Sequence, residues 1–280
     1  MHATSVMDLS ERAQAAAAGD KAAARDILTA VEDDVYGLSL RMLGHPADAE
    51  DAAQEILVIV LTHLGSFRSE SSVRTWVWRI AANHLSRVRR GRRETMTFET
   101  LGERLRTGLS EADVDHSDPE SDALTREVRL RCTEAMLLSL DRDHRIAYLL
   151  GDIFHLSGEE AAEVLELDPT VFRKRLSRAR SRLYDFMRGW CGVYDSSNPC
   201  RCSGQTHAAT ERGIIVPEEL YLSKQRSRPS AAVLERASNE VSGLLRVAEV
   251  LHGPSEYLAP STLVVSVREL LDSERLALLR

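Results

Sequence analysis

Two neighbouring stretches of the 280-residue chain concentrate charge of opposite sign. Between Ser71 and Arg93 there are seven arginines and no acidic residue, with Asn83 and two tryptophans among them. The stretch just before carries acidic and amide side chains: Asp48, Glu50, Asp51, Gln54 and Glu55. A solvated helix usually carries both positive and negative side chains. A stretch that carries only positive charge, together with asparagine and tryptophan, therefore favours nucleic-acid binding. The acidic patch then indicates a second, different partner.

A third group of side chains has the chemistry of metal ligands: Cys191, Cys200, Cys202 and His207. These soft or borderline ligands are enough for a tetrahedral site, which would hold zinc or another soft metal. Two other interpretations stay open. Arg201 and Arg212 would favour thiolate and hence a redox switch, or the cysteines are unreactive structural residues. Cys132 lies at a helical core spacing and is expected to be a small buried hydrophobe.

Helical periodicity places the charged groups on defined faces. Residues 48–64 predict a helix whose apolar face is Ala49, Ala52, Ala53, Ile56, Val60 and Leu64. A second helix is expected from Val73, with a buried face made of Val73, Trp76, Val77, Ile80, Ala81 and Val88. Its polar face repeats Arg79, Asn83, Ser86 and Arg90 at i, i+4, i+7 and i+11. Trp76 is therefore expected in the core, whereas Trp78 is expected to be exposed.

The elements around these two helices predict a compact all-α domain over residues 8–93. Apolar spacing indicates one helix from Leu9 and two more, around Ala23–Val31 and Val35–Leu43, before Gly44-His45-Pro46 ends the last. Residues 94–127 are polar, with ten acids against three arginines, and predict a linker with a short helix near Leu101–Leu105.

A second helical domain is expected over residues 128–188. Ser157 and Glu160 form a capping box, and Asp168 followed by Pro169 predicts the start of a long helix. That helix buries Phe172, Leu176, Ala179 and Leu183 and turns other side chains outward: Thr170, Arg173, Lys174, Ser177 and Arg178. Two helices with this turn predict a helix-turn-helix, whose second helix reads the major groove.

The runs DAEDAAQEI and FRSESSVRTWVWRIAANH resemble region 2 of sigma-70 family RNA polymerase initiation factors of the extracytoplasmic-function (ECF) group. The second domain, with its SRAR run at Ser177–Arg180, resembles region 4. The resemblance implies docking on the polymerase β′ clamp helices through Asp48, Glu50, Asp51, Gln54, Glu55 and Ile56. It implies promoter −10 contacts from Arg74, Arg79, Asn83, Arg87 and Arg90. It also implies −35 recognition and a β-flap contact by the helix carrying Thr170, Arg173, Lys174, Ser177 and Arg178.

Two segments are not explained by the two motifs alone. The acidic linker is either a solvated tether or, as the resemblance suggests, a strand that lies along the RNA exit path. Beyond region 4 come a Cys/His-containing loop at 189–213 and a helical extension at 214–280, with apolar stripes at Leu234–Leu251 and Leu263–Leu271. Some ECF factors carry cysteine-rich metal-sensing extensions. We expect a regulatory extension acting in cis; a separate anti-sigma factor is left open.

Bulk properties limit the alternatives. The net charge of the whole chain is −7, which equals the net charge of residues 94–127. The remaining residues are therefore near neutral in total and carry basic stripes. No apolar run approaches the roughly 18 residues of a membrane span, and the N-terminus lacks signal-peptide features, so a cytosolic protein without a membrane partner is expected. One rival is a helix-turn-helix regulator that acts without polymerase. The other, a thiol or metal enzyme, lacks an HExxH, GxSxG or P-loop motif, so no catalysis and no required cofactor are expected.

Overall fold

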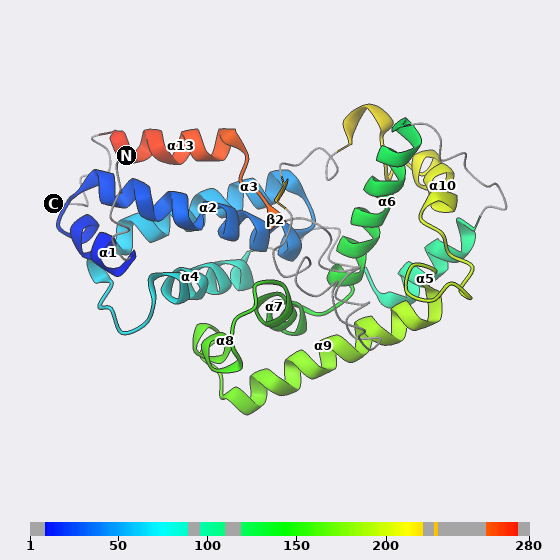
Figure 1. The fold of residues 1–280 in the computed structure, drawn as a ribbon, viewed down its shortest axis with the longest axis horizontal. Helices are drawn as coiled ribbons and strands as arrows, with labels where there is room; N and C mark the ends of the chain where they lie inside the picture. Colours follow the sequence, from blue (N-terminus) through cyan, green and yellow to red (C-terminus); the bar gives the residue numbers. More distant parts are fainter. Residues whose placement is uncertain (1–8, 89–95, 110–118, 221–226, 229–255, 274–280) are drawn as a thin grey trace, which may run out of the picture.

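The computed structural model describes residues 9–88, 96–109, 119–220, 227–228 and 256–273, and within them the expected all-α fold is confirmed (Figure 1). The elements are α1 (Leu9–Ala17), α2 (Lys21–Leu43), α3 (Pro46–His63), η1 (Leu64–Ser66), α4 (Val73–Arg87), α5 (Phe98–Thr107), α6 (Pro119–Leu138), α7 (Arg142–Tyr148), η3 (Leu149–Ile153), α8 (Gly158–Val164), α9 (Pro169–Trp190), η4 (Ser203–Gln205), α10 (Thr206–Glu211), η5 (Pro217–Glu219), β1 (Ser227–Arg228), β2 (Glu256–Tyr257) and α13 (Ser261–Asp272). The two short strands pair antiparallel. None of the described helices combines the length and the hydrophobicity that a membrane span requires.

Helices α1 to α4 form the first module. Asp20 caps α2 by accepting a hydrogen bond from the backbone N–H of Ala22 at 2.8 Å, and Gly44 ends it at a left-handed φ of 70°. The two helices expected within this span are one continuous helix. The segment between the two apolar stretches is Glu32-Asp33-Asp34, which contains no glycine or proline that would end a helix. Val31 and Val35 on either side of it are both buried.

Helices α6 to α9 form the second module, and α7, α8 and α9 each begin at a side-chain cap. Asp141 accepts from the backbone N–H of His144 at 3.0 Å, and the Ser157–Glu160 capping box is complete. Asp168 accepts from the Thr170 N–H at 2.7 Å, with Pro169 in the first turn. Helix α6 begins at Pro119, inside the segment expected to be linker. The short linker helix is present as α5 and is longer than expected.

The residues beyond α9, which comprise the Cys/His-containing loop and the extension, pack back on both modules. Helix α13 lies along α2 and α3 of the first module, whereas α10 packs on α6 of the second (Figure 1). The predicted stripe at Leu263–Leu271 is confirmed, because Leu263, Val267 and Leu271 are buried. The stripe at Leu234–Leu251 lies outside the described residues.

Candidate nucleic-acid interface

Helix α9 presents the predicted reading face to solvent. Its apolar stripe is buried as expected, with Phe172 and Leu183 at 1% and 0% exposure. On the opposite side all five predicted DNA-binding residues are exposed: Thr170, Arg173, Lys174, Ser177 and Arg178. Arg173 donates a hydrogen bond to the Thr170 hydroxyl at 3.3 Å, within the same face. The face therefore offers both cations for phosphates and donors for base edges.

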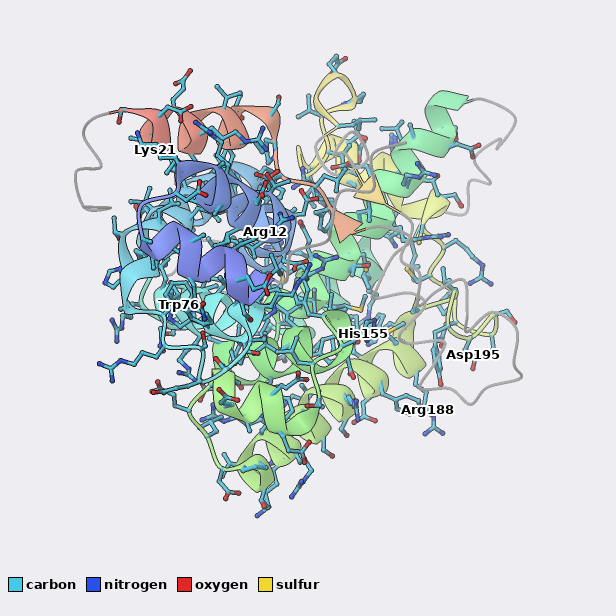
Figure 2. All side chains as sticks on the ribbon, turned by 60° about the vertical axis from the view of Figure 1, so that its left-hand side comes forward. Arg12, Lys21, Trp76, His155, Arg188 and Asp195 are labelled. Atoms are coloured by element: carbon cyan, nitrogen blue, oxygen red, sulfur yellow. The ribbon has the colours of Figure 1, made fainter. Side chains whose placement is uncertain are left out.

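Three further arginines of α9 are engaged with carboxylates of α7 and η3: Arg175 with Asp143 at 3.0 Å, Arg180 with Asp152 at 2.9 Å, and Arg182 with Asp141 at 3.1 Å. Burial alone would raise the pKa of Asp141, but hydrogen bonds from His144 and Arg182 lower it. The hydrogen bond from Arg180 to Asp152 raises the pKa of the guanidinium. These arginines hold α9 in place. Arg188, at the other end of α9, is exposed and lies at the edge of the molecule (Figure 2).

Helix α4 presents only part of its predicted face. Asn83 and Arg87 are exposed. Arg74 is also exposed but pairs with Asp34 of α2 at 2.6 Å, and the half-buried Arg79 pairs with Glu163 of α8 at 2.9 Å. Arg90 lies outside the described residues. Asn83 and Arg87, in the C-terminal half of α4, are therefore the exposed predicted residues that lie outside these two ion pairs.

The prediction for the two tryptophans is wrong, because Trp78 is buried and Trp76 is the more exposed of the two. Trp78 is 5% exposed, and its ring centroid lies 4.5 Å from that of Phe154, which follows η3. Trp76 is only half-buried, with its ring centroid 5.5 Å from that of Phe67. The reason is a second covering layer. The second module packs on the side of α4 that a free helix would turn to solvent.

Two arginines of α7 hold the modules together through helix ends. Arg142 donates to the backbone carbonyls of Leu85, Ser86 and Val88 at the end of α4, at 3.1, 3.2 and 2.7 Å. Arg145, 1% exposed, donates to the carbonyl of Met42 at the end of α2 and to carbonyls of Leu138 and Leu140 in its own module. A cation at a helix C-terminus satisfies free carbonyls and the negative end of the dipole.

Helix α3 carries the predicted docking face. Asp48, Asp51 and Glu55 are exposed, and Gln54 beside them is half-buried. Ile56 was predicted as a docking residue, but this is wrong, because its side chain is 0% exposed. It lies on the apolar stripe that packs into the first module, so no partner surface can reach it.

Two residues of this face were missed. A shallow depression on α3 is lined by Asp51, Gln54, Glu55, Val58 and Ile59. Val58 and Ile59 follow Gln54 and Glu55 at i+4, so they give the acidic surface an apolar floor. That spacing was visible in the sequence. Glu50 sits at the edge of the surface, where its carboxylate accepts a hydrogen bond from Thr262 of α13.

The structure brings together the cysteines but not the histidine. Cys191 ends α9, and its backbone forms a bridge to Cys200. The Gln205 amide donates to the Cys200 sulfur at 3.9 Å. His207 instead points to solvent and pairs with Glu211 at 3.1 Å. In the described part of the chain, no three His, Cys, Asp or Glu side chains are arranged to hold a metal ion.

Burial favours the protonated form of the Cys132, Cys200 and Cys202 thiols, because it raises their pKa values. Burial, and then the neighbouring Cys202 and Cys191, raise the pKa of Cys200 to about 11. Burial also raises the pKa of Cys132 well above its usual value, and the other three cysteines add to this. Arg201 lowers the pKa of Cys200, but less than burial raises it, and Arg212 is bonded to Thr107 at 2.8 Å. These thiols are poor nucleophiles at neutral pH.

Two family models match the chain, Sigma-70 region 2 over residues 27–95 and Sigma-70 region 4 over residues 130–183. The ECF RNA polymerase sigma factor SigW of Bacillus subtilis is 29% identical over 184 residues, which are 65% of this chain and 98% of SigW. The RNA polymerase sigma-H factor of Pseudomonas aeruginosa is 31% identical over 169 residues, which are 59% of this chain and 86% of that factor. Neither model reaches the extension.

Among solved structures, that of CnrH in complex with the cytosolic domain of CnrY is similar, with a TM-score of 0.45 and 22% identity. The match covers 63% of this chain and 95% of that chain.

Proposed function

The chain belongs to the sigma-70 family of RNA polymerase sigma factors, in the extracytoplasmic-function group, and on that premise we propose how its surfaces divide the work of promoter-directed initiation. It binds core RNA polymerase and directs it to promoters. The observation that carries the division is the separation of three exposed faces: the acidic face of α3, the C-terminal half of α4, and the polar face of α9. The chain lends selectivity to the polymerase in the cytoplasm and performs no catalysis itself.

Helix α9 reads the −35 element in duplex form. Its exposed Lys174 and Arg178 lie one turn apart on the face that carries Thr170, and such donors recognise base edges and phosphates in a major groove. The paired arginines on its flank fix the angle at which the helix enters the groove.

Helix α4 captures the −10 element after strand separation. Asn83 supplies an amide that pairs with the edge of an unstacked base, and Arg87 supplies a cation for the adjacent phosphate. Arg79 lies one turn before Asn83 and becomes available to phosphate when its ion pair with Glu163 opens.

The two modules must separate for this work. The −10 and −35 elements lie about 25 base pairs apart, which is about 85 Å along B-DNA at 3.4 Å per base pair. In this structure α4 and α8 are in contact, with Arg79 and Glu163 2.9 Å apart. The arrangement is therefore a closed one, and promoter binding requires an open one.

Charge reversal on α3 tests the docking assignment. Asp51→Lys combined with Glu55→Lys should weaken association with core polymerase at least tenfold, because both carboxylates are exposed at the apolar floor of Val58 and Ile59. Association is measured by fluorescence anisotropy of the labelled full chain, and activity by run-off transcription on a genomic promoter pool. Glu99→Lys combined with Glu103→Lys, at two exposed positions of α5 with the same i, i+4 spacing and the same change in net charge, is the matched control.

Unchanged association of the α3 double variant would contradict the docking assignment. An unmodified chain that binds promoter DNA but never core polymerase would instead favour a helix-turn-helix regulator that acts alone.

The soft-metal site at the cysteines stays a prediction, with one change of ligand. Cys132 is proposed as the fourth ligand in place of His207, because Cys191, Cys200 and Cys202 help to raise the pKa of Cys132 whereas His207 pairs with Glu211. The four thiols are not arranged around an ion in this structure, so metal binding would have to draw them together. A divalent cation would displace the thiol protons and be held by the resulting thiolates. Zinc content after equilibration with the metal should then fall in Cys132→Ala and not in His207→Ala. Equal metal content in the two variants, or none in the unmodified chain, would reject this site.

A further inference from the structure

The C-terminal extension meets both DNA-reading modules at one arginine of α2. Arg41 is 6% exposed and donates to the carbonyl of Gly37 at 3.1 Å. Its guanidinium carbon lies 4.6 Å from the ring centroid of Tyr257, which belongs to β2 of the extension. It also lies 5.8 Å from the ring of Phe154, which belongs to the second module. An arginine this well buried gains from contact with aromatic rings.

Space at this junction is limited by the backbone of α2. A Cβ built on Gly37 would lie 3.2 Å from the Arg41 guanidinium and 3.8 Å from both the Phe154 ring and the Tyr257 carbonyl. Three parts of the chain therefore converge over a residue without a side chain. Beside them is a cavity of about 360 Å³, which both modules and Tyr257 line.

Helix α13 holds Tyr257 at this place. It runs antiparallel to α2, as its polar contacts show in order. The Ala259 N–H donates to Asp33 at 2.8 Å, Arg268 donates to Thr29 at 3.1 Å, and Asp272 pairs with Arg25. Between these contacts, Leu263, Val267 and Leu271 are buried. Figure 1 shows the two helices side by side.

We propose that the extension is an intramolecular latch for the closed arrangement. With α13 on α2, Tyr257 completes the aromatic surroundings of Arg41, and Phe154 can pack on Trp78 only while the second module is closed on the first. Extension docking and promoter binding are thus negatively coupled. The proposal deepens the promoter-directing function, on which it rests. The acidic face of α3 stays accessible, since Asp48, Asp51 and Glu55 are exposed while α13 meets this face at Glu50.

Two pairs of full-length variants test the latch. Val267→Asp places a charge in the buried seam, and its matched control Val265→Asp changes the same residue type on the same helix where it is 52% exposed. Tyr257→Ala removes the ring from Arg41, and Tyr257→Phe retains it. The measurements are the radius of gyration of the free chain by small-angle X-ray scattering, and run-off transcription at limiting core polymerase.

Val267→Asp and Tyr257→Ala should both increase the radius of gyration and raise transcription. For Tyr257→Ala the rise should be about 3- to 30-fold, the range expected from loss of a partly desolvated cation–π contact. Val265→Asp and Tyr257→Phe should match the unmodified chain. An unchanged radius of gyration for both Val267→Asp and Tyr257→Ala would overturn the latch. Scattering decides this without polymerase, so absent transcription from every chain counts against the promoter-directing function alone.

Discussion

Helices α4 and α9 both carry arginines on a polar face, yet they differ in how many of their sides are covered. Helix α9 has one apolar stripe, formed by Phe172, Leu176, Ala179 and Leu183, and its polar face is open. Helix α4 has two stripes. One is Val73, Val77 and Ala81, and the other is Trp78, Ala82 and Leu85. A helix with one stripe packs on one neighbour, whereas a helix with two is held between two.

The difference sets which helix can meet DNA first. The reading face of α9 is available in the closed arrangement, because its engaged arginines are only those that bind α7 and η3. Helix α4 keeps Asn83 and Arg87 exposed but holds Arg79 in an ion pair with Glu163. Duplex contact through α9 therefore does not require opening, whereas full strand capture by α4 does.

The largest effect is expected on α9. Arg178→Ala should lower affinity for −35 duplex DNA about 10- to 100-fold, since one good base contact is worth about 1–3 kcal/mol of discrimination. The duplex is selected from a promoter pool, and affinity is measured by fluorescence anisotropy at fixed salt. Arg188→Ala removes an exposed arginine from the last turns of the same helix and should cost less than threefold. Equal losses in both variants would mean that α9 binds by charge alone.

A smaller effect, confined to strand capture, is expected on α4. Asn83→Ala should reduce open-complex formation with core polymerase about tenfold, because it removes an exposed amide that pairs with an unstacked base. Permanganate reactivity of unpaired thymines measures the opening. The same variant should leave binding of −35 duplex by the free chain unchanged. A loss of duplex binding comparable to that of Arg178→Ala would break the distinction between the two helices.

The sequence predicts the open face of α9 better than that of α4 for a physical reason. The stripe, the caps and the turn that define α9 are all local in sequence, and all are present. The burial of Trp78 depends on Phe154, which comes from another module. The apolar spacing of Trp78, Ala82 and Leu85 at i, i+4 and i+7 indicates that a second face of α4 is buried, but it does not identify the residues that bury this face.

The same limit applies to the docking face and the cysteines. Ile56 belongs to an apolar stripe in the sequence, so periodicity alone excludes it from a docking surface. The approach of Cys132 to the cysteines beyond α9 has no local sign, because α6 and that loop are far apart in the chain. Contacts between distant segments are the part of the site that a sequence pattern does not contain.

The smallest expected effect is a difference between α4 and α9 in how the stability of their N-terminal caps depends on pH. Helix α4 is capped by the Ser72 hydroxyl, which accepts from the Thr75 N–H at 3.0 Å, and α9 by the Asp168 carboxylate. Hydrogen bonds from the Thr170 backbone N–H lower the pKa of Asp168 below its usual value of 3.8. A lowered folded-state pKa means that the cap's stabilisation is present above the unfolded pKa and is lost as pH falls toward the folded one. Acid should therefore weaken the start of α9 and leave the start of α4 intact.

Backbone amide shifts by NMR between pH 6 and pH 3 measure this contrast. The Thr170 amide should titrate with Asp168, and the Thr75 amide should not. Asp168→Asn keeps an oxygen acceptor at the cap but removes the proton equilibrium, so the Thr170 shift should become independent of pH in this range. If Thr75 and Thr170 moved together in the unmodified chain, acid would be loosening the closed arrangement as a whole, and the two helices would not differ in the way that their caps predict.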